Sequence, residues 1–334
     1  MRENVPLAAL TTLRVGGPAR FVHSGDSLDS IKAAVAHARD SGLPLHPLGQ
    51  GSNVLASDSP IDAVILKMES DGLTFVPHAD YVEVIIDAGY SWDALVRAAA
   101  SEGLWGIENL AGIPGTAGAA PAQNIGAYGA ELADAFAWLE CYDAATDSVR
   151  RLDAEACGFG YRDSRFKREP GLIILRIALR LSRTAAPRLG YADLKRLADA
   201  GEILDSPQAI GEAVRRIRSM KFPDLSECGT AGSFFKNPVI SPEAHMRLQA
   251  RYPELPGFET AAGIKIPLAW ILDHVLALRG FRLGRARLFE SQPLVLVTEE
   301  GATAQDVETL ANHVSSAVFE ATQIAIEREV RSIP

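Results

Sequence analysis

The chain has 334 residues and a formal net charge of −9, with 47% hydrophobic and 22% charged residues. This length is sufficient for two or three domains with separate cores. The negative charge argues against nucleic acid or an anionic membrane surface as a partner. The three cysteines include no CxxC and the seven histidines no HxxxH or HxH spacing, which indicates neither a disulfide framework nor a metal site.

The N-terminal sequence MRENVPLAALTTLRVGG lacks the long apolar run of a signal peptide. No other stretch is apolar for long enough to span a bilayer. We therefore expect a cytoplasmic protein.

The first seventy residues predict a strand, a helix and two further strands. Residues 20–23 form a short strand, and Ser27 then caps a helix that ends at Gly42. Residues 45–48 and 63–67 have the pattern of strands. The apolar face of the helix is formed by Leu28, Ile31, Ala34, Val35 and Ala38.

A second strand–helix unit follows. Residues 81–88 alternate as a strand, and Ser91 caps a helix that runs through Ala100. Beyond the glycine-rich stretch 112–129, strands are predicted at 136–142 and 172–181, with a hairpin turn at 144–148.

The character of the sequence changes near residue 184, where a polar connection runs to residue 201. Helices are predicted at 209–220 and 242–252. The segment LAWILDHVLAL and a helix at 304–319 flank a strand at 293–297, and a last strand covers 324–333. This pattern predicts an α+β fold with an N-terminal region of about 180 residues and a second region of about 120–150.

The stretch LGQGSNVL, residues 48–55, contains a G-x-G that resembles a dinucleotide-binding loop. Val54 stands where the third glycine would be, and Asp58 and Pro60 follow instead of a helix. We interpret the stretch as an anion-binding nest of backbone N–H groups, with side-chain donors from Ser52 and Asn53. A plain turn between two strands remains the alternative.

The stretch GIPGTAGAAPAQNIGAYG, residues 112–129, carries no charge and little bulk. Gly112, Gly115 and Gly118 recur every three residues, so the backbone is open to a flat or phosphate-bearing ligand. Ile113 and Ile125 are candidates to sandwich a ring. A tightly packed irregular loop is the alternative, but two donor loops after successive strand–helix units suit a pyrophosphate.

Seven short stretches together resemble one enzyme family. In chain order they are TTLRVGGPA, LGQGSNVL, GIPGTAGAAPAQNIGAYG, YRDSRFK, AGSFFKNP, KIPLAWILD and EREVRSI. The ordered set spans nearly the whole chain and resembles the UDP-N-acetylenolpyruvoylglucosamine reductases, flavoenzymes of bacterial peptidoglycan precursor synthesis.

The resemblance implies a PCMH-type (vanillyl-alcohol-oxidase-like) FAD-binding fold of two subdomains, followed by a smaller α+β substrate domain. We expect the first subdomain at 1–70, joined by the terminal strand near 324–334. The second subdomain is expected at 71–205 and the substrate domain at 206–323.

The resemblance also implies FAD as cofactor and NADPH as hydride donor. The implied substrate is a UDP-sugar enolpyruvyl ether, UDP-N-acetylglucosamine enolpyruvate, which is reduced to UDP-N-acetylmuramate; we expect a monomer. At Gln50 the family commonly has glycine. The residues implied to contact FAD are Gly49, Gln50, Gly51, Ser52, Asn53, Ile113, Pro114, Gly115, Thr116, Gln123, Ile125 and Gly126.

The implied reaction passes hydride from flavin N5 to C3 of the enolpyruvyl group, so negative charge develops at C2 and in the carboxylate. The resemblance assigns the binding of the enolpyruvyl carboxylate to Arg162, and Tyr161 is expected to orient this arginine. A guanidinium suits this role because it presents two parallel donors. An arginine after a tyrosine, taken alone, is more often part of a surface ion pair.

The resemblance assigns proton donation at C2 to Ser233 in AGSFFKNP. A serine hydroxyl is a weak acid, so this role needs a hydrogen-bond chain that resupplies its proton. A core hydroxyl bonded to the backbone is the alternative.

The closing sequence IEREVRSI places Glu327, Glu329 and Arg331 on one face of an extended strand. The resemblance selects Glu329 as the catalytic glutamate. A carboxylate repels an anionic intermediate unless it is protonated or shares a proton, so we expect Glu329 to be neutral at that step. A solvated strand edge is the alternative.

The substrate diphosphate needs local cations, and we expect no metal ion. Lys221 and Lys265 are the candidates, although each lysine alone is more often a surface charge. Tyr191, Asn237 and Gln292 are the implied neutral partners. The segment GYADLKRL around Tyr191 resembles the form of the family that closes a tyrosine-bearing loop over the substrate.

Two other functions fit part of the sequence. One is another PCMH-type FAD oxidoreductase that oxidises a small alcohol; such enzymes often tether the flavin through His or Cys, and neither glycine-rich loop contains one. The other is a flavin- or nucleotide-binding regulatory protein, which would not need the set Arg162, Ser233 and Glu329.

Overall fold

The first strands form a four-stranded sheet in the computed structural model, which describes residues 1–334. Helix α1 (Leu28–Asp40) begins after Ser27, whose hydroxyl accepts the Ser30 N–H, and Gly42 follows its end with a φ of +65°. The predicted strand–helix–strand order is confirmed. The strand order is β1 (Arg2–Pro6), β2 (Pro18–Gly25), β5 (Ile61–Met68) and β3 (Leu45–Leu48).

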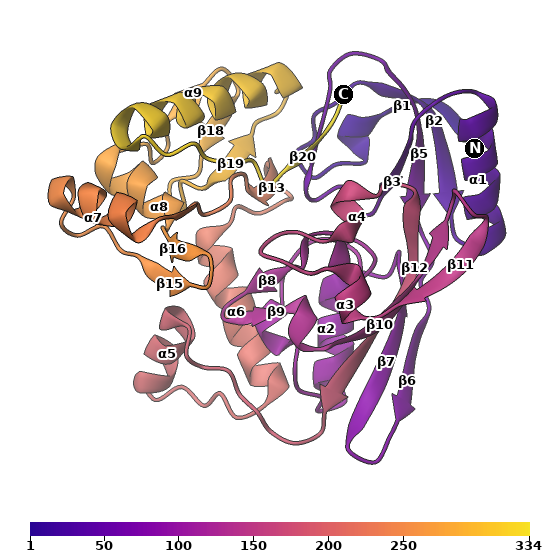
Figure 1. Cartoon of the computed structure of the whole chain (residues 1–334), viewed down its shortest axis with the longest axis horizontal. Helices are drawn as coiled ribbons and strands as arrows, with labels where there is room; N and C mark the ends of the chain where they lie inside the picture. Colours follow the sequence, from indigo (N-terminus) through magenta and orange to yellow (C-terminus); the bar gives the residue numbers. More distant parts are fainter. The chain divides into compact units, whose positions relative to one another are not determined.

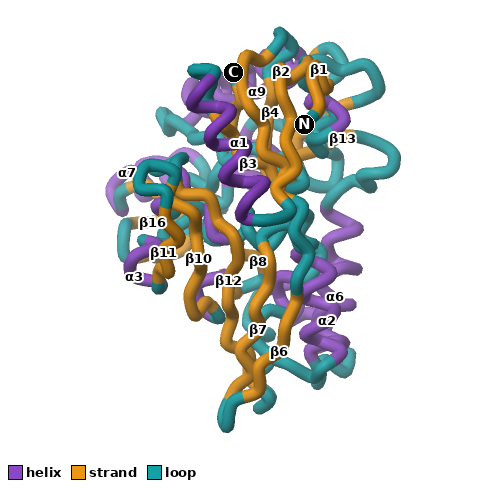
Figure 2. Tube along the Cα trace, turned by 90° about the vertical axis from the view of Figure 1, so that its right-hand side faces the viewer, coloured by secondary structure: helices purple, strands orange, loops and turns teal.

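A five-stranded antiparallel sheet follows, and its strands lie side by side in Figure 2. Their order is β11 (Ser148–Leu152), β10 (Phe136–Asp143), β12 (Leu172–Ser182), β7 (Tyr81–Asp87) and β6 (Leu73–Pro77). Helix α2 (Trp92–Ser101) begins after Ser91 as predicted and buries Trp92 and Leu95 in the same core. Helix α6 (Pro207–Lys221) lies beside α2 (Figures 1 and 2).

Short elements fill the segments that sequence patterns did not resolve. They are β8 (Gly126–Ala127), β9 (Ala130–Glu131), α3 (Ala154–Cys157), α4 (Arg165–Arg168) and α5 (Ala192–Asp199). Helix α5 lies inside the segment that the sequence predicted to be a polar connection. Leu194 is fully buried there, and Lys195 pairs with Asp199 one turn later, which explains a helix in a polar stretch.

The C-terminal region contains two small sheets, and its mixture of helices and strands confirms the α+β prediction. One sheet has the order β13 (Gly229–Ser233), β19 (Val295–Thr298), β18 (Ala286–Leu288) and β17 (Arg282–Leu283), and the other β14 (Val239–Ile240), β16 (Gly263–Lys265) and β15 (Phe258–Thr260). The helices are α7 (Pro242–Arg251), α8 (Leu268–Trp270), which continues as a π-helical turn over Ile271–Val275, and α9 (Ala304–Thr322).

The predicted strand at 324–333 is wrong over most of its length. Only β20 (Arg331–Ile333) is a strand, paired in parallel with β4 (Val54–Ala56). The residues before it pair instead with the chain after β13, through an isolated bridge between Phe235 and Arg328. Because the segment changes partner, the backbone bends at Val330, and the period-two alternation does not extend across that bend.

The chain divides into two compact units. The first unit contains residues 1–5, 19–50 and 62–219, and the second contains residues 6–18, 51–61 and 220–334. Segments from the start of the chain belong to the second unit because they pack there: the Thr12 carbonyl accepts the Thr230 N–H. Each unit has its own apolar core.

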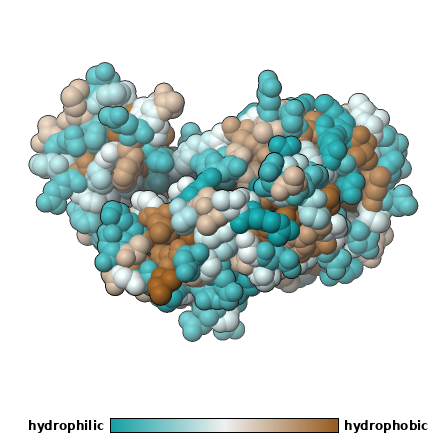
Figure 3. Space-filling model, turned by 90° about the horizontal axis from the view of Figure 1, so that it is seen from below, coloured by the Kyte–Doolittle hydropathy of each residue, from teal (hydrophilic) through white to brown (hydrophobic).

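One face of the molecule carries both hydrophilic and hydrophobic areas (Figure 3). Hydrophilic residues cover much of the face in Figure 3, with smaller hydrophobic areas between them. None of the helices combines the length and the apolar composition that a membrane crossing requires.

Candidate active site

The first glycine-rich loop, residues 49–53, runs from β3 to β4. Gly51 has a φ of +67°, and a Cβ there would lie 2.3 Å from the Leu10 carbonyl oxygen, so only glycine fits. Lys67 on β5 donates through Nζ to the Gly49 carbonyl, and burial lowers the pKa of this lysine. Sequence reasoning missed Lys67; its only signal is a cation near the end of the apolar run AVILKM.

The second glycine-rich loop is fixed on the turn between β7 and α2. Gly112 and Gly115 have φ values of +70° and +135°. The Gly115 carbonyl accepts the Trp92 N–H at 3.0 Å, and the Gly118 N–H donates to the Ala88 carbonyl at 2.9 Å. A Cβ at position 118 would lie 2.5 Å from the Ala88 Cβ, so glycine is required for this close approach.

The two glycine-rich loops contact each other within the first unit. The Gly115 N–H donates to Oε1 of Gln50 at 3.0 Å. A Cβ on Gly49 would lie only 2.5 Å from the Thr116 hydroxyl oxygen. The backbone of the first loop at Gly49 therefore lies directly against the Thr116 side chain of the second loop. Thr116 is buried, and its hydroxyl has no hydrogen-bond partner in the protein. A buried hydroxyl is normally paired, so it fits a polar ligand at this junction.

Arg162 is held in a strained backbone conformation beside the second loop. Its φ of +53° is uncommon for a residue with a side chain and costs about 1–3 kcal/mol. Nη2 of Arg162 donates to the Gly126 carbonyl at 2.5 Å, and Nζ of Lys167 donates to the Arg162 carbonyl at 2.6 Å. The guanidinium also lies 5.6 Å from the centre of the Tyr161 ring. The surroundings therefore fix both the backbone and the side chain of Arg162.

Tyr191 stands at the start of α5, and its side chain is 45% exposed. Its ring contacts the ring of Tyr128 edge-on, with the two centres 5.2 Å apart. Burial raises the pKa of Tyr128 to about 12. Tyr128 lies in the glycine-rich stretch 112–129, but the sequence gives no signal of a role for it.

Ser233 lies in the second unit at the end of β13, where the pairing with β19 is irregular. Thr230 is opposite Val297 and Ser233 opposite Val295, so an extra residue bulges between them. Gly232 takes up this bulge with a φ of +75°. A β-bulge changes the direction of the side chain that follows it, which here is the Ser233 hydroxyl.

Glu329 is tied to both Asn53 and the strand of Ser233. Its N–H donates to the carbonyl of Phe234, the residue after Ser233, at 2.8 Å. Nδ2 of Asn53 donates to the Glu329 carbonyl at 3.2 Å, and the Arg331 N–H donates to the Asn53 carbonyl at 3.1 Å. The second unit thus brings Asn53, Glu329 and the end of β13 together through hydrogen bonds to backbone groups.

The other sequence-predicted residues lie at the ends of elements or in loops. In the first unit, Ile125 is buried and Ile113 and Gln123 are half-buried, whereas Pro114 is exposed. In the second unit, Oδ1 of Asn237 accepts the Leu268 N–H at 2.9 Å, which anchors the start of α8. Half-buried positions are also occupied by Ser52, Lys221 at the end of α6, Lys265 on β16 and Gln292 before β19.

No group of three or more His, Cys, Asp or Glu side chains is placed to hold a metal ion. The polar groups in the loop region of the first unit include backbone N–H groups, the Thr116 hydroxyl and the cations of Lys67 and Arg162. Such donors bind phosphate oxygens and the polar edge of an aromatic ring system.

Comparisons with known proteins give matches along nearly the whole chain. Residues 19–153 match a family model described as an FAD binding domain, and residues 224–333 match the C-terminal domain of UDP-N-acetylenolpyruvoylglucosamine reductase. The chain is 39% identical to the UDP-N-acetylenolpyruvoylglucosamine reductase of Pseudomonas aeruginosa, over 98% of both chains. The reductase of Shigella sonnei is also 39% identical, over 99% of this chain and 96% of its own length. The crystal structure of the reductase from Thermus caldophilus, 25% identical, matches with a TM-score of 0.69 over 99% of this chain and 98% of that one.

Proposed function

Because the chain belongs to the UDP-N-acetylenolpyruvoylglucosamine reductase family, we propose that it takes hydride from NADPH and that Arg162, Ser233 and Glu329 act on its substrate. The chain is an FAD-dependent oxidoreductase with a PCMH-type FAD-binding fold and a smaller C-terminal domain, as the sequence predicted. It reduces UDP-N-acetylglucosamine enolpyruvate in peptidoglycan synthesis. The observation that carries this function is the 39% identity over 98% of both chains, which does not favour a small-alcohol oxidase.

The residues of the two glycine-rich loops fit FAD. The Thr116 hydroxyl is buried without a protein partner, and Gly115 beside it has a φ of +135°, which residues with a side chain rarely adopt. We assign to FAD the residues 49–53, 113–116, Gln123, Ile125 and Gly126. When bound, FAD supplies the hydride that reduces the enolpyruvyl double bond. The protein supplies the donors that hold it, and Lys67 fixes the Gly49 carbonyl of the first loop.

Arg162 binds the enolpyruvyl carboxylate. Negative charge grows in that carboxylate as hydride arrives, and a guanidinium stabilises it with two parallel charge-assisted hydrogen bonds. The contacts to Gly126, Lys167 and the Tyr161 ring fix the arginine before substrate binds. A fixed donor needs little reorganisation during the reaction, which is the source of its catalytic effect.

Ser233 gives the proton to C2, and Glu329 stabilises the enol-like intermediate in a protonated or proton-sharing form. The bulge before Ser233 gives its hydroxyl a direction that differs from that of a regular strand. The Glu329 backbone is held by the carbonyl of Phe234 and by Asn53, so its position is coupled to the strand that carries Ser233.

We assign the binding of the substrate diphosphate to Lys221 and Lys265, with Tyr191, Asn237 and Gln292 as neutral partners in the substrate site. Tyr161 belongs to the same site as the residue that orients Arg162. We further propose the division into residues 1–70 with 324–334, residues 71–205 and residues 206–323 as two FAD-binding subdomains and a substrate domain. We propose that the protein acts as a monomer.

A steady-state assay with the FAD-loaded protein tests the function. NADPH is expected to be consumed slowly alone, and rapidly and in equal amount to substrate once UDP-N-acetylglucosamine enolpyruvate is added. Unchanged NADPH consumption with that substrate rejects the proposal.

The variant Ser233→Ala tests the proposed proton donor by stopped-flow absorbance. It is expected to leave flavin reduction by NADPH nearly intact and to slow flavin reoxidation by substrate about 10²–10⁴-fold, the usual contribution of a positioned proton donor. Equal impairment of both half-reactions would make Ser233 structural.

A further inference from the structure

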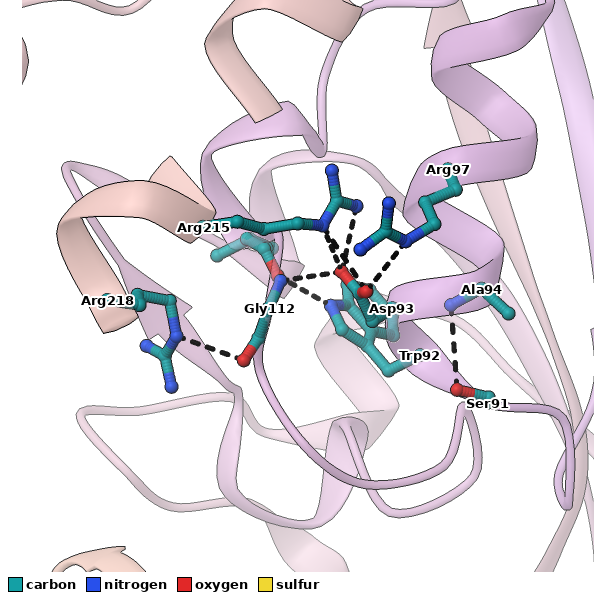
Figure 4. A network of polar contacts seen from close by, with 9 residues as sticks. Ser91, Trp92, Asp93, Ala94, Arg97, Gly112, Arg215 and Arg218 are labelled. Atoms are coloured by element: carbon teal, nitrogen blue, oxygen red, sulfur yellow. Dashed lines mark hydrogen bonds and ion pairs between the residues drawn. The ribbon is translucent and has the colours of Figure 1, made fainter. Parts of the chain in front are cut away.

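Gly112, the first glycine of the second loop, is held at both of its backbone polar groups by charged side chains (Figure 4). Its N–H donates to Oδ1 of Asp93 at 2.6 Å, and its carbonyl accepts Nε of Arg218 at 3.0 Å. Gly112 also has a φ of +70°, which favours glycine. Asp93 lies in the first turn of α2, and Arg218 lies on α6.

Asp93 is itself fixed by arginines from two helices. Nε and Nη2 of Arg215 on α6 lie 2.9 and 2.8 Å from Oδ1 of Asp93. Arg97, one turn along α2, donates to Oδ2 at 3.0 Å. Burial alone would raise the pKa of Asp93, but the hydrogen bonds from Arg215 and from the Gly112 N–H outweigh it and lower that pKa. The carboxylate therefore stays charged while it holds Gly112.

The chain immediately before Gly112 is anchored to the same helix. Trp92 is fully buried, and its Nε1 donates to the Leu110 carbonyl at 3.0 Å. The chain from residue 110 to residue 112 is thus held to the first turn of α2 by two hydrogen bonds, and Arg218 on α6 binds the Gly112 carbonyl.

A buried ion pair is a poor way to gain stability, because desolvation offsets much of the attraction. The side chains of Arg215 and Asp93 are only 17% and 27% exposed, and Arg215 comes from an element more than a hundred residues away in sequence. An apolar contact between α2 and α6 would stabilise that packing at least as well. The ion pair adds something that an apolar contact cannot: Arg215 holds the charged Asp93 carboxylate in one place, where it accepts the hydrogen bond of the Gly112 N–H.

We infer that Asp93 and Arg215 are positioning residues that set the conformation of Gly112 and thereby aim the backbone donors of residues 113–116 at FAD. This inference rests on the proposed FAD contacts of the second loop. Neither Asp93 nor Arg215 is assigned a contact with the cofactor; both act through Gly112.

The test compares Asp93→Asn and Arg215→Met with Arg97→Met. Asparagine keeps the shape and can still accept the Gly112 N–H, but without charge. Methionine keeps the apolar stem of the arginine. Arg97 is the matched control because it contacts the same carboxylate from a side chain that is 60% exposed.

Three quantities are measured for each protein. The FAD dissociation constant is measured by flavin fluorescence, and the absorption spectrum of bound flavin is recorded at saturation. Urea unfolding without FAD reports the stability of the protein itself.

We expect Asp93→Asn and Arg215→Met to weaken FAD binding about tenfold, equivalent to one charge-assisted hydrogen bond, and to shift the bound-flavin spectrum. Arg97→Met is expected to change affinity less than about twofold, and Arg215→Lys to recover part of the loss. Unchanged affinity and spectrum in both main variants would overturn the inference, as would losses no larger than those of Arg97→Met. Failure of the unmodified protein to bind FAD would instead reject the proposed FAD site, and this inference with it.

Discussion

Glu327 and Glu329 lie two positions apart, yet their surroundings differ. The carboxylate of Glu327 is 75% exposed and pairs with Nζ of Lys236 at 2.9 Å. Glu329 is half-buried, and its backbone is held by Asn53 and by the carbonyl of Phe234. An exposed ion pair contributes little, whereas a half-buried glutamate on a backbone held by hydrogen bonds is better suited to sharing a proton. These surroundings support the assignment of Glu329.

Glu329→Gln is expected to slow substrate-dependent flavin reoxidation by about 10²-fold or more, because the amide keeps the shape but cannot share a proton in the same way. Glu327→Gln is the matched control and is expected to cost less than about tenfold, since it removes an exposed ion pair. Both variants are compared by stopped-flow absorbance with FAD bound. A severe loss in Glu327→Gln with a mild one in Glu329→Gln would reverse the assignment.

Thr116→Val is expected to affect FAD affinity and the stability of the FAD-free protein in different directions. The hydroxyl is buried without a partner in the protein, so its removal is expected to leave the FAD-free protein as stable as before or up to about 1–3 kcal/mol more stable. FAD affinity is expected to fall several-fold, because a donor to the cofactor is lost. Urea unfolding without FAD and fluorescence titration with FAD measure the two effects. A less stable FAD-free protein with unchanged affinity would contradict the assigned role.

At the scale of elements, the long helix α9 depends on a side chain from the start of the chain. Oδ1 and Oδ2 of Asp58 accept the N–H groups of Ala304 and Gln305 at 2.7 and 3.0 Å. Thr303 caps the same helix locally by accepting the Asp306 N–H at 3.1 Å. The local cap is readable from sequence, but the carboxylate of Asp58 reaches the helix only through the fold of the second unit.

Asp58→Ala is expected to lower the free energy of unfolding by about 1–2 kcal/mol, because it removes a charged acceptor at a helix N-terminus. Asp62→Ala is the control: this aspartate is 80% exposed and pairs only with Arg20 at the surface, so its loss is expected to cost less than about 0.5 kcal/mol. Urea unfolding followed by circular dichroism measures both. Equal losses would mean that Asp58 does not cap α9.

At the scale of the whole molecule, FAD binding is coupled to folding. A ligand that binds only the native state adds stability that grows with its concentration, about 2.7 kcal/mol at one hundred times its dissociation constant. FAD is expected to raise Tm accordingly, whereas riboflavin, which lacks the diphosphate, is expected to raise it much less. Thermal unfolding with each flavin measures this difference. Riboflavin also lacks the adenosine, so equal shifts would show that neither the diphosphate nor the adenosine adds to affinity, which would contradict the proposed FAD contacts of the two loops.

Local signals determined the helices and the long strands. Ser27 and Ser91 cap their helices as the sequence predicted, and the alternating or continuous apolar runs of β7 and β12 form strands. The two glycine-rich loops could be located because glycine, which has no side chain, is identified directly in the sequence. The ordered motifs also indicated the family, since their residues are read directly from the chain.

Tertiary structure decided which residues meet. The bend at Val330 exists because the terminal segment exchanges one partner strand for another, and no local pattern records that exchange. Lys67 and Asp93 support the loops from other elements, so their roles depend on distances in space and not on spacing in sequence. Periodicity reports the face of an element that is buried; only the folded chain determines which charged side chain lies against which backbone group.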